Sequence, residues 1–173
     1  MNKVRRALTV AALGFASLAL ASCGETPVAT APQQTISQHN LLWPVTGLLA
    51  CTPLPADSVT QVIGPDGGTI NIGPHSFMVP AGALDSAVAI TAVSPSSFVN
   101  RVAFQPSGLH FRHAARLTMS YANCGLLTNL LPARIAYVDD LLNILYFLPS
   151  LGHTQSQAVT ASVRHFSDYA VAW

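Results

Sequence analysis

Hydrophobic and polar residues alternate in short stretches of this chain from Val59 onward. Residues 116–121, Arg-Leu-Thr-Met-Ser-Tyr, alternate at every position. Successive side chains of a β-strand point to opposite faces, so Leu117, Met119 and Tyr121 share one face and the polar residues share the other. This pattern predicts a strand with one buried face.

A second stretch, residues 157–164, alternates in the same way and places Val159, Ala161 and Val163 on one face. Residues rich in β-branched and aromatic side chains mark further candidate strands. These candidates are residues 69–72, 75–79, 87–93, 101–104, 134–138, 143–148 and 169–173.

Turn-forming residues separate the candidate strands and supply the backbone angles that tight turns need. We therefore predict an all-β fold, a β-sandwich of about nine to ten short strands after a flexible N-terminal tether, with a closed barrel as the alternative. Residues 126–131 fit either a short helical turn or a buried loop. The turn segments are residues 64–68, 80–83, 94–97, 105–108 and 139–140.

The N-terminus has the pattern of an export signal. Three basic residues within the first six precede an apolar stretch at residues 7–21. Leu-Ala-Ser-Cys at residues 20–23 resembles the lipobox of bacterial lipoproteins, which implies that residues 1–22 are a signal peptide and that Cys23 receives the lipid. The alternative is a cleaved, soluble secretory protein in which Cys23 is incidental.

The residues after the lipobox divide into a tether and a head. Residues 23–40 are mostly Pro, Thr, Gln and Ala, a composition typical of a flexible linker. Residues 41–173 form the predicted β-sandwich domain. Several acyl chains on Cys23 would hold the head at a membrane, and Gly24, in place of the Asp that favours inner-membrane retention in enteric bacteria, favours the outer membrane.

Composition narrows the function classes. Of 173 residues, 50% are hydrophobic and 9% are charged, and 8 basic residues against 7 acidic ones leave a net charge of +1. Such a balance provides no field for nucleic acid. No uninterrupted apolar run reaches the roughly 20 residues that a membrane-spanning helix needs. We therefore expect one soluble domain in the bacterial cell envelope.

Two cysteines remain once Cys23 is assigned to lipid, and only one pairing is available to them. In an oxidising compartment, Cys51 and Cys124 are expected to form a disulfide, which would stabilise the fold by roughly 4 to 5 kcal/mol in the loop-entropy model. Two buried free thiols are the competing interpretation. A metal site is disfavoured because no paired His completes a tetrahedral set.

Residues 64–84, GPDGGTINIGPHSFMVPAGAL, resemble the opening of the ZU-five domain through a Gly-Gly turn, a strand, and a Val-Pro pair followed by Gly-Ala-Leu. Residues 102–111 and 117–121 follow that family's order of strand, Pro-Gly turn, Phe and alternating strand. One departure is His-Ala-Ala at residues 113–115, where the family usually has Pro. The resemblance implies a β-sandwich that serves as an interaction module.

Near the C-terminus, His165-Phe166-Ser167 resembles the cleavage tripeptide of self-cutting death-domain proteins, which also carry ZU-five domains, and the GAIN domains of adhesion receptors. The resemblance implies that His165 is a general base, that Phe166 supplies the attacked carbonyl and that Ser167 is the nucleophile. The alternative is that all three are strand residues, and that residues 169–173 continue an apolar face into the core.

Other polar residues give weaker signals. His110 and His113 are three apart, which places them on opposite faces of a strand and argues against joint metal binding. Asp139 and Asp140 fit a solvated turn better than a cation site. The sequence has neither a Gly-x-Ser-x-Gly nucleophile elbow nor a phosphate-binding loop, so a hydrolase or metalloenzyme is disfavoured and no cofactor is expected.

We therefore predict an envelope-anchored lipoprotein that acts as a non-catalytic interaction or structural module. Its expected partners are the membrane, through the lipid on Cys23, and an envelope protein or surface ligand. The alternative is a self-cleaving module, cut between Phe166 and Ser167 by an intramolecular acyl shift.

Overall fold

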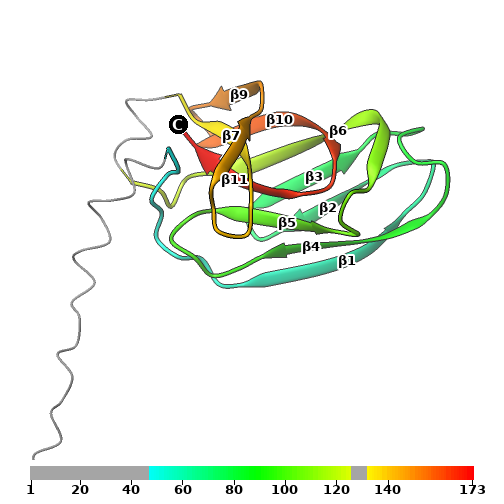
Figure 1. Ribbon diagram of the computed structural model, residues 1–173, viewed down its shortest axis with the longest axis horizontal. Coiled ribbons are helices and arrows are strands. Elements are labelled where there is room, and N and C mark those ends of the chain that lie inside the picture. The colour runs from blue at the N-terminus through cyan, green and yellow to red at the C-terminus, as the bar shows by residue number, and fades with distance from the viewer. Residues whose placement is uncertain (1–46, 126–131) are drawn as a thin grey trace, which may run out of the picture. The chain divides into compact units, whose positions relative to one another are not determined.

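The computed structural model describes residues 47–125 and 132–173, which form eleven β-strands and no helix (Figure 1). All strand pairs are antiparallel, and the strands form two sheets. The six-stranded sheet contains, in spatial order, β1 (Asp57–Ile63), β4 (Val88–Ser94), β5 (Arg101–Gln105), β11 (Asp168–Ala172), β7 (Arg134–Val138) and β8 (Ile144–Phe147). The five-stranded sheet contains β2 (Gly68–Ile72), β3 (His75–Val79), β6 (His110–Ser120), β10 (Ala158–His165) and β9 (Ser150–His153).

The fold is a β-sandwich, as predicted, and not a closed barrel. The two alternating stretches of the sequence lie in β6 and β10, which pair with each other so that Leu117 faces Ala161 and Met119 faces Val159. All four side chains are buried, as is Val163. The alternation therefore correctly predicted the inner face of the five-stranded sheet.

Strand β1 was not among the predicted strands, and two further strand segments differ from the prediction. Strand β9, Ser-Leu-Gly-His, has no alternating pattern and exists because it pairs with the first half of β10. Strand β6 begins at His110, so it extends six residues before the predicted start at Arg116. Pairing with a neighbouring strand explains both, because hydrogen bonds across a ladder extend strands whose local preference is weak.

Aromatic rings fill the space between the two sheets. The Phe77 ring lies 4.5 Å from that of Phe104 and 5.8 Å from that of Phe111, measured between ring centroids. Phe77 comes from the five-stranded sheet and Phe104 from the six-stranded sheet, so this contact joins the two layers. Aromatic pairs at such distances add to the stability that burial provides.

A second, smaller apolar cluster contains residues that alternate with the core-facing positions of β7 and β11. Ala136 and Ala170 are fully buried there, and Leu48 packs in the same cluster. Leu48 also forms a β-bridge with Ala172. The segment that enters the domain at Gly47 is thus part of the folded head.

A Gly-Gly turn joins β1 to β2, and its backbone geometry explains why residue 67 is a glycine. Gly67 has a φ of 75°, and a Cβ atom at this position would collide with the Val79 carbonyl oxygen. The Gly82 N–H donates to the Pro65 carbonyl at 2.7 Å, so this turn contacts the turn that follows β3. The turn at residues 64–68 and the turn at residues 80–83 therefore meet in space.

Several predictions concern residues outside the described part of the chain. They are the signal peptide at residues 1–22, the lipid attachment at Cys23, the tether through residue 40, and the helical turn or loop at residues 126–131.

Candidate functional site

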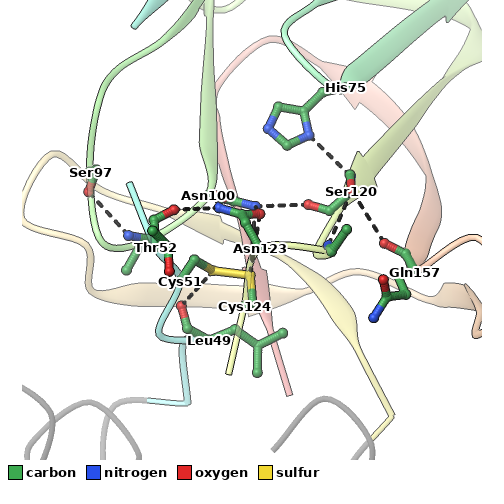
Figure 2. The surroundings of a disulfide bond; sticks show 12 residues. Leu49, Cys51, Thr52, His75, Ser97, Asn100, Ser120, Asn123, Cys124 and Gln157 are labelled. Carbon is green, nitrogen blue, oxygen red and sulfur yellow. Dashed lines mark hydrogen bonds between the residues drawn. A yellow bond between two sulfur atoms is a disulfide. The ribbon is translucent and has the colours of Figure 1, made fainter. Parts of the chain in front are cut away.

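A disulfide joins Cys51 to Cys124, as the cysteine count predicted, and free thiols are excluded in this structure (Figure 2). The sulfur atoms are 2.06 Å apart, and the two residues form an isolated antiparallel β-bridge. The backbone of this segment is held by two further hydrogen bonds, from Cys51 N–H to the Phe98 carbonyl and from Thr52 N–H to the Asn123 carbonyl, each at 2.8 Å. The disulfide thus joins the segment that precedes β1 to the segment that follows β6.

Two asparagines bond to each other beside the disulfide. The Asn100 amide donates to the Asn123 side-chain oxygen at 2.7 Å, and the Asn123 amide donates back to Asn100 at 3.0 Å. Asn100 also donates to the Ser120 carbonyl at 2.9 Å, and Asn123 donates to the Thr52 carbonyl at 2.6 Å. We call Cys51, Asn100, Asn123 and Cys124 the disulfide corner. Asn100 is buried and Asn123 is half-buried, and both amides are paired with protein groups, as buried polar groups usually are.

His75 lies near the same region and is buried (Figure 2). Its Nδ1 accepts a hydrogen bond from the Ser120 backbone N–H at 3.1 Å, which places the ring proton on Nε2. Nε2 is buried without a hydrogen-bond partner in the described part of the chain. Burial lowers the pKa of His75 to about 4, because the charged ring would lose its hydration. His75 is therefore neutral at pH 7.

Phe166 and Ser167 form the connection between β10 and β11, and thus between the two sheets. We call this connection the β10–β11 turn. Phe166 is buried, and its ring stacks on Phe104 at 5.1 Å with an interplanar angle of 12°. It meets Phe111 edge-on, also at 5.1 Å, and its N–H donates to the Leu109 carbonyl at 2.8 Å. The middle residue of the predicted tripeptide is therefore a core residue.

His165 ends β10 and lies among other rings. Its ring centroid is 5.6 Å from that of Tyr137 and 5.8 Å from that of His110. His110 is the direct cross-strand partner of His165, after an irregularity in the ladder that follows Val163. Sequence reasoning missed this pair, because a register shift between distant strands leaves no local signal.

The structure does not join His165 and Ser167 by a hydrogen bond. His165 Nδ1 lies 3.5 Å from the Phe166 carbonyl oxygen, and the Ser167 hydroxyl forms no hydrogen bond within residues 47–125 and 132–173. A general base must lie within hydrogen-bond reach of the proton that it takes. The predicted base and nucleophile are thus two residues apart in the chain, and no hydrogen bond joins them.

The residues that follow the turn continue into the core. Tyr169 and Val171 are buried in the main core cluster, and Trp173 packs against it, as the packing interpretation of the C-terminus predicts. The Tyr169 hydroxyl donates to the His165 carbonyl at 2.6 Å, and burial, with a smaller effect of Tyr137, raises the pKa of the Tyr169 phenol. This hydrogen bond fixes the backbone at the end of β10.

Asp168, the first residue of β11, is partly buried. Burial raises the pKa of its carboxyl group, whereas Arg101, whose guanidinium lies 3.8 Å from the carboxylate, opposes that rise. The contact is long for an ion pair and exposed enough to be screened by water. Asp168 therefore provides little electrostatic support to the turn.

Asp139 closes the turn that was predicted at residues 139–140. The Asp139 carboxylate accepts hydrogen bonds from the backbone of Leu141 and from the backbone and side chain of Asn143, at 2.8 to 2.9 Å. The side-chain bond to Asn143 is the main reason that the pKa of Asp139 is lowered.

Within the described residues, no three His, Cys, Asp or Glu side chains are grouped to hold a metal ion.

Large hydrophobic side chains are exposed along one side of the sandwich. We call Leu141, Leu145, Tyr146 and Leu151 the apolar edge; their exposed fractions are 82%, 53%, 61% and 65%. Strand β8 is the last strand of the six-stranded sheet and β9 is the last of the five-stranded sheet, so this side presents the adjoining edges of both layers. Sequence reasoning missed the apolar edge: Leu145 and Tyr146 lie in the predicted strand at residues 143–148, and the sequence does not indicate that this strand lies at the end of a sheet.

No protein-family model matches this sequence, and no curated protein matches it. In the part of the chain that the structure describes, no helix has the length and hydrophobicity needed to cross a bilayer.

Proposed function

We propose that this chain is an envelope-anchored lipoprotein whose ZU-five-like head acts as a non-catalytic interaction module. The observation that carries this proposal is the apolar edge. Four of the six exposed large hydrophobic residues in the described ranges fall within residues 141–151. Clustered apolar exposure marks contact surfaces, whereas single exposed residues are ordinary.

The edge strand also lacks charge and proline, two of the features by which proteins discourage pairing. Strand β8 reads Ile-Leu-Tyr-Phe, with no charge and no proline. On the opposite side of the six-stranded sheet, β1 begins with Asp57, whose carboxylate accepts a hydrogen bond from the Gly73 N–H at 2.8 Å. Charged residues, prolines and covering loops usually protect free edges. Strand β8 therefore fits a partner better than β1 does.

A lipid on Cys23 would keep this head at a membrane surface, with the tether at residues 23–40 allowing it to reach a partner. Labelled palmitate tests this part of the proposal. The full chain expressed in bacteria should incorporate the label and sediment with membranes, with the outer membrane favoured. Cys23→Ala should abolish both properties. Palmitate incorporation that survives this substitution would contradict the assignment of Cys23.

Site-specific photo-crosslinking tests the interaction surface. A photoreactive phenylalanine analogue would replace Leu151 on β9 or, as the matched control, Val62 on β1, whose exposed fractions are 65% and 66%. We expect discrete adducts from position 151 in the envelope and few from position 62. Equal adducts at the two positions, or none at position 151, would contradict the proposed surface.

Self-cleavage is the second candidate function, and one observation favours it. The Phe166 carbonyl oxygen accepts a hydrogen bond from the Gly108 N–H at 3.4 Å and lies 3.5 Å from His165 Nδ1, which adds a second donor to this carbonyl in the tautomer that carries its proton on Nδ1. In the reaction, Ser167 Oγ would bond to the Phe166 carbonyl carbon while the hydroxyl proton passes to His165 as the base. The peptide C–N bond would then break, and the same proton would pass to the freed amine of Ser167. Water would then hydrolyse the ester. Chain scission that Ser167→Ala abolishes would establish this function.

A further inference from the structure

Strand β8 has one free side. It pairs with β7 on its inner side, and no strand of the described ranges pairs with its outer side. Its four residues are uncharged, and Leu145 and Tyr146 are more than half exposed. A free strand edge presents unpaired N–H and C=O groups that another strand can satisfy.

Opposite charges lie at the two ends of β8. Asp140 precedes the strand in the β7–β8 turn. Strands β7 and β8 are antiparallel, with Ala136 opposite Phe147, so Arg134 lies beside the carboxyl end of β8. The Arg134 guanidinium carbon is 5.7 Å from the centre of the Phe147 ring, so this side chain extends from β7 over β8.

Neither charge forms an ion pair within the described part of the chain: Arg134 contacts the Phe147 ring, and Asp140 interacts with the like charge of Asp168. The ion pairs found there are Arg101 with Asp168 and Arg112 with Asp85. The neighbouring Asp139 is occupied by the hydrogen bonds that close the turn. Strand β8 thus has a negative charge at one end and a positive charge at the other, and neither is neutralised by an ion pair in the described ranges.

We propose that the partner of β8 is a second copy of this chain, paired antiparallel about a twofold axis. This arrangement reverses the second strand, so Asp140 of each copy lies beside Arg134 of the other. The six-stranded sheets of the two copies then join into one continuous sheet. The proposal rests on the proposed interaction function and names its partner.

The small size of the contact suggests where this pairing occurs. Two four-residue strands bury less than the roughly 1,200 Å² that stable complexes in solution need. Lipid anchors confine the copies to one surface, which raises their effective concentration without any new contact. We therefore expect the dimer on membranes and little of it in dilute solution.

Cross-linking of the full chain in bacterial membranes tests this pairing. Tyr146→Cys would be treated with a bismaleimide reagent, and Val62→Cys on β1 is the matched control because its exposed fraction is similar, 66% against 61%. The unsubstituted chain controls for the native cysteines. We expect a product of twice the chain mass that is about fivefold more abundant for Tyr146→Cys than for Val62→Cys.

A charge exchange then tests the orientation in the Tyr146→Cys background. Arg134→Asp and Asp140→Arg should each lower the cross-linked fraction about threefold, because each places like charges side by side. The two substitutions together should restore it, which also shows that the substituted chains fold. Asp66→Arg, in the β1–β2 turn, is the control and should change nothing.

Three results would overturn the dimer. Equal cross-linking at positions 146 and 62 would indicate random collision, and failure of the double exchange to restore cross-linking would exclude the antiparallel orientation. Products of Tyr146→Cys with a different mass would replace the second copy with another partner and leave the interaction function standing. No product with any protein at position 146 would overturn both the dimer and the proposed role of the apolar edge.

Discussion

The disulfide corner and the β10–β11 turn both hold polar groups against the core, but they are ordered in different ways. In the disulfide corner, a covalent bond and reciprocal amide hydrogen bonds connect Cys51, Asn100, Asn123 and Cys124. In the turn, order comes from the Phe166 ring, and the neighbouring Ser167 hydroxyl forms no hydrogen bond in the described ranges.

This difference shows why a short sequence motif is weak evidence for catalysis. His165-Phe166-Ser167 matches a cleavage tripeptide in letters, but its central residue is committed to packing. The disulfide corner has no motif, yet its side chains form a connected set. A reactive site requires groups that engage one another in space, and the structure shows no hydrogen bond between His165 and Ser167, whereas the side chains of the corner are bonded to one another.

Removal of the disulfide is expected to have the largest effect. The bond spans a sequence separation of 73 residues, so Cys51→Ala with Cys124→Ala should lower the free energy of unfolding by roughly 4 to 5 kcal/mol. Urea unfolding measures this change. A loss below about 1 kcal/mol would indicate that the hydrogen bonds of the corner suffice without the covalent bond.

Truncation of Phe166 is expected to cause the second-largest loss of stability. Phe166→Ala leaves a cavity among Phe77, Phe104 and Phe111 and should cost about 3 to 5 kcal/mol in unfolding free energy. The control is Phe98→Ala, because Phe98 is 43% exposed and should cost much less. Equal losses in the two variants would contradict the role of Phe166 as the residue that orders the turn.

Acid should weaken the fold through His75, next to the disulfide corner. Its pKa is about 4 in the fold and 6.5 in the unfolded chain, so the unfolded state binds the proton first as the pH falls. The contribution of His75 to the free energy of unfolding is fully present above pH 6.5 and should have fallen by about 3 kcal/mol at pH 4. Unfolding curves across this range measure the decline, and His75→Gln should remove most of it. An unchanged slope in that variant would assign the acid sensitivity to other groups.

The smallest effect is expected at Ser167. Its hydroxyl has no hydrogen bond to lose within the described part of the chain, so Ser167→Ala should change the unfolding free energy by less than about 0.5 kcal/mol. Thermal unfolding of the Ser167→Ala and Phe166→Ala variants under the same conditions compares the two losses of stability. A large loss at Ser167 would indicate a contact that the packing account of the turn lacks.

The sequence predicted features that depend on local pattern or on simple counting. Alternation in residues 116–121 and 157–164 predicted the buried faces of β6 and β10, and the cysteine count predicted the bond between Cys51 and Cys124. These predictions succeed because a period of two defines a strand face wherever the strand pairs.

Features that depend on which strands become neighbours escaped prediction. The contact of His110 with His165 follows from a ladder irregularity after Val163, and β9 exists only through its pairing with β10. The exposure of Tyr146 follows from the position of β8 at the end of a sheet. Strand order is set by contacts between distant segments, which composition and periodicity do not encode.

The most direct test of the account is the mass of the purified mature chain under denaturing, non-reducing conditions. Denaturation also releases a cleaved C-terminal strand that would otherwise stay bound to the rest of the domain. The account predicts one intact chain, ending at Trp173, that is two hydrogens lighter than its reduced form because Cys51 and Cys124 are joined. Loss of the mass of residues 167–173, restored by Ser167→Ala, would contradict it and make the β10–β11 turn a self-cleaving site.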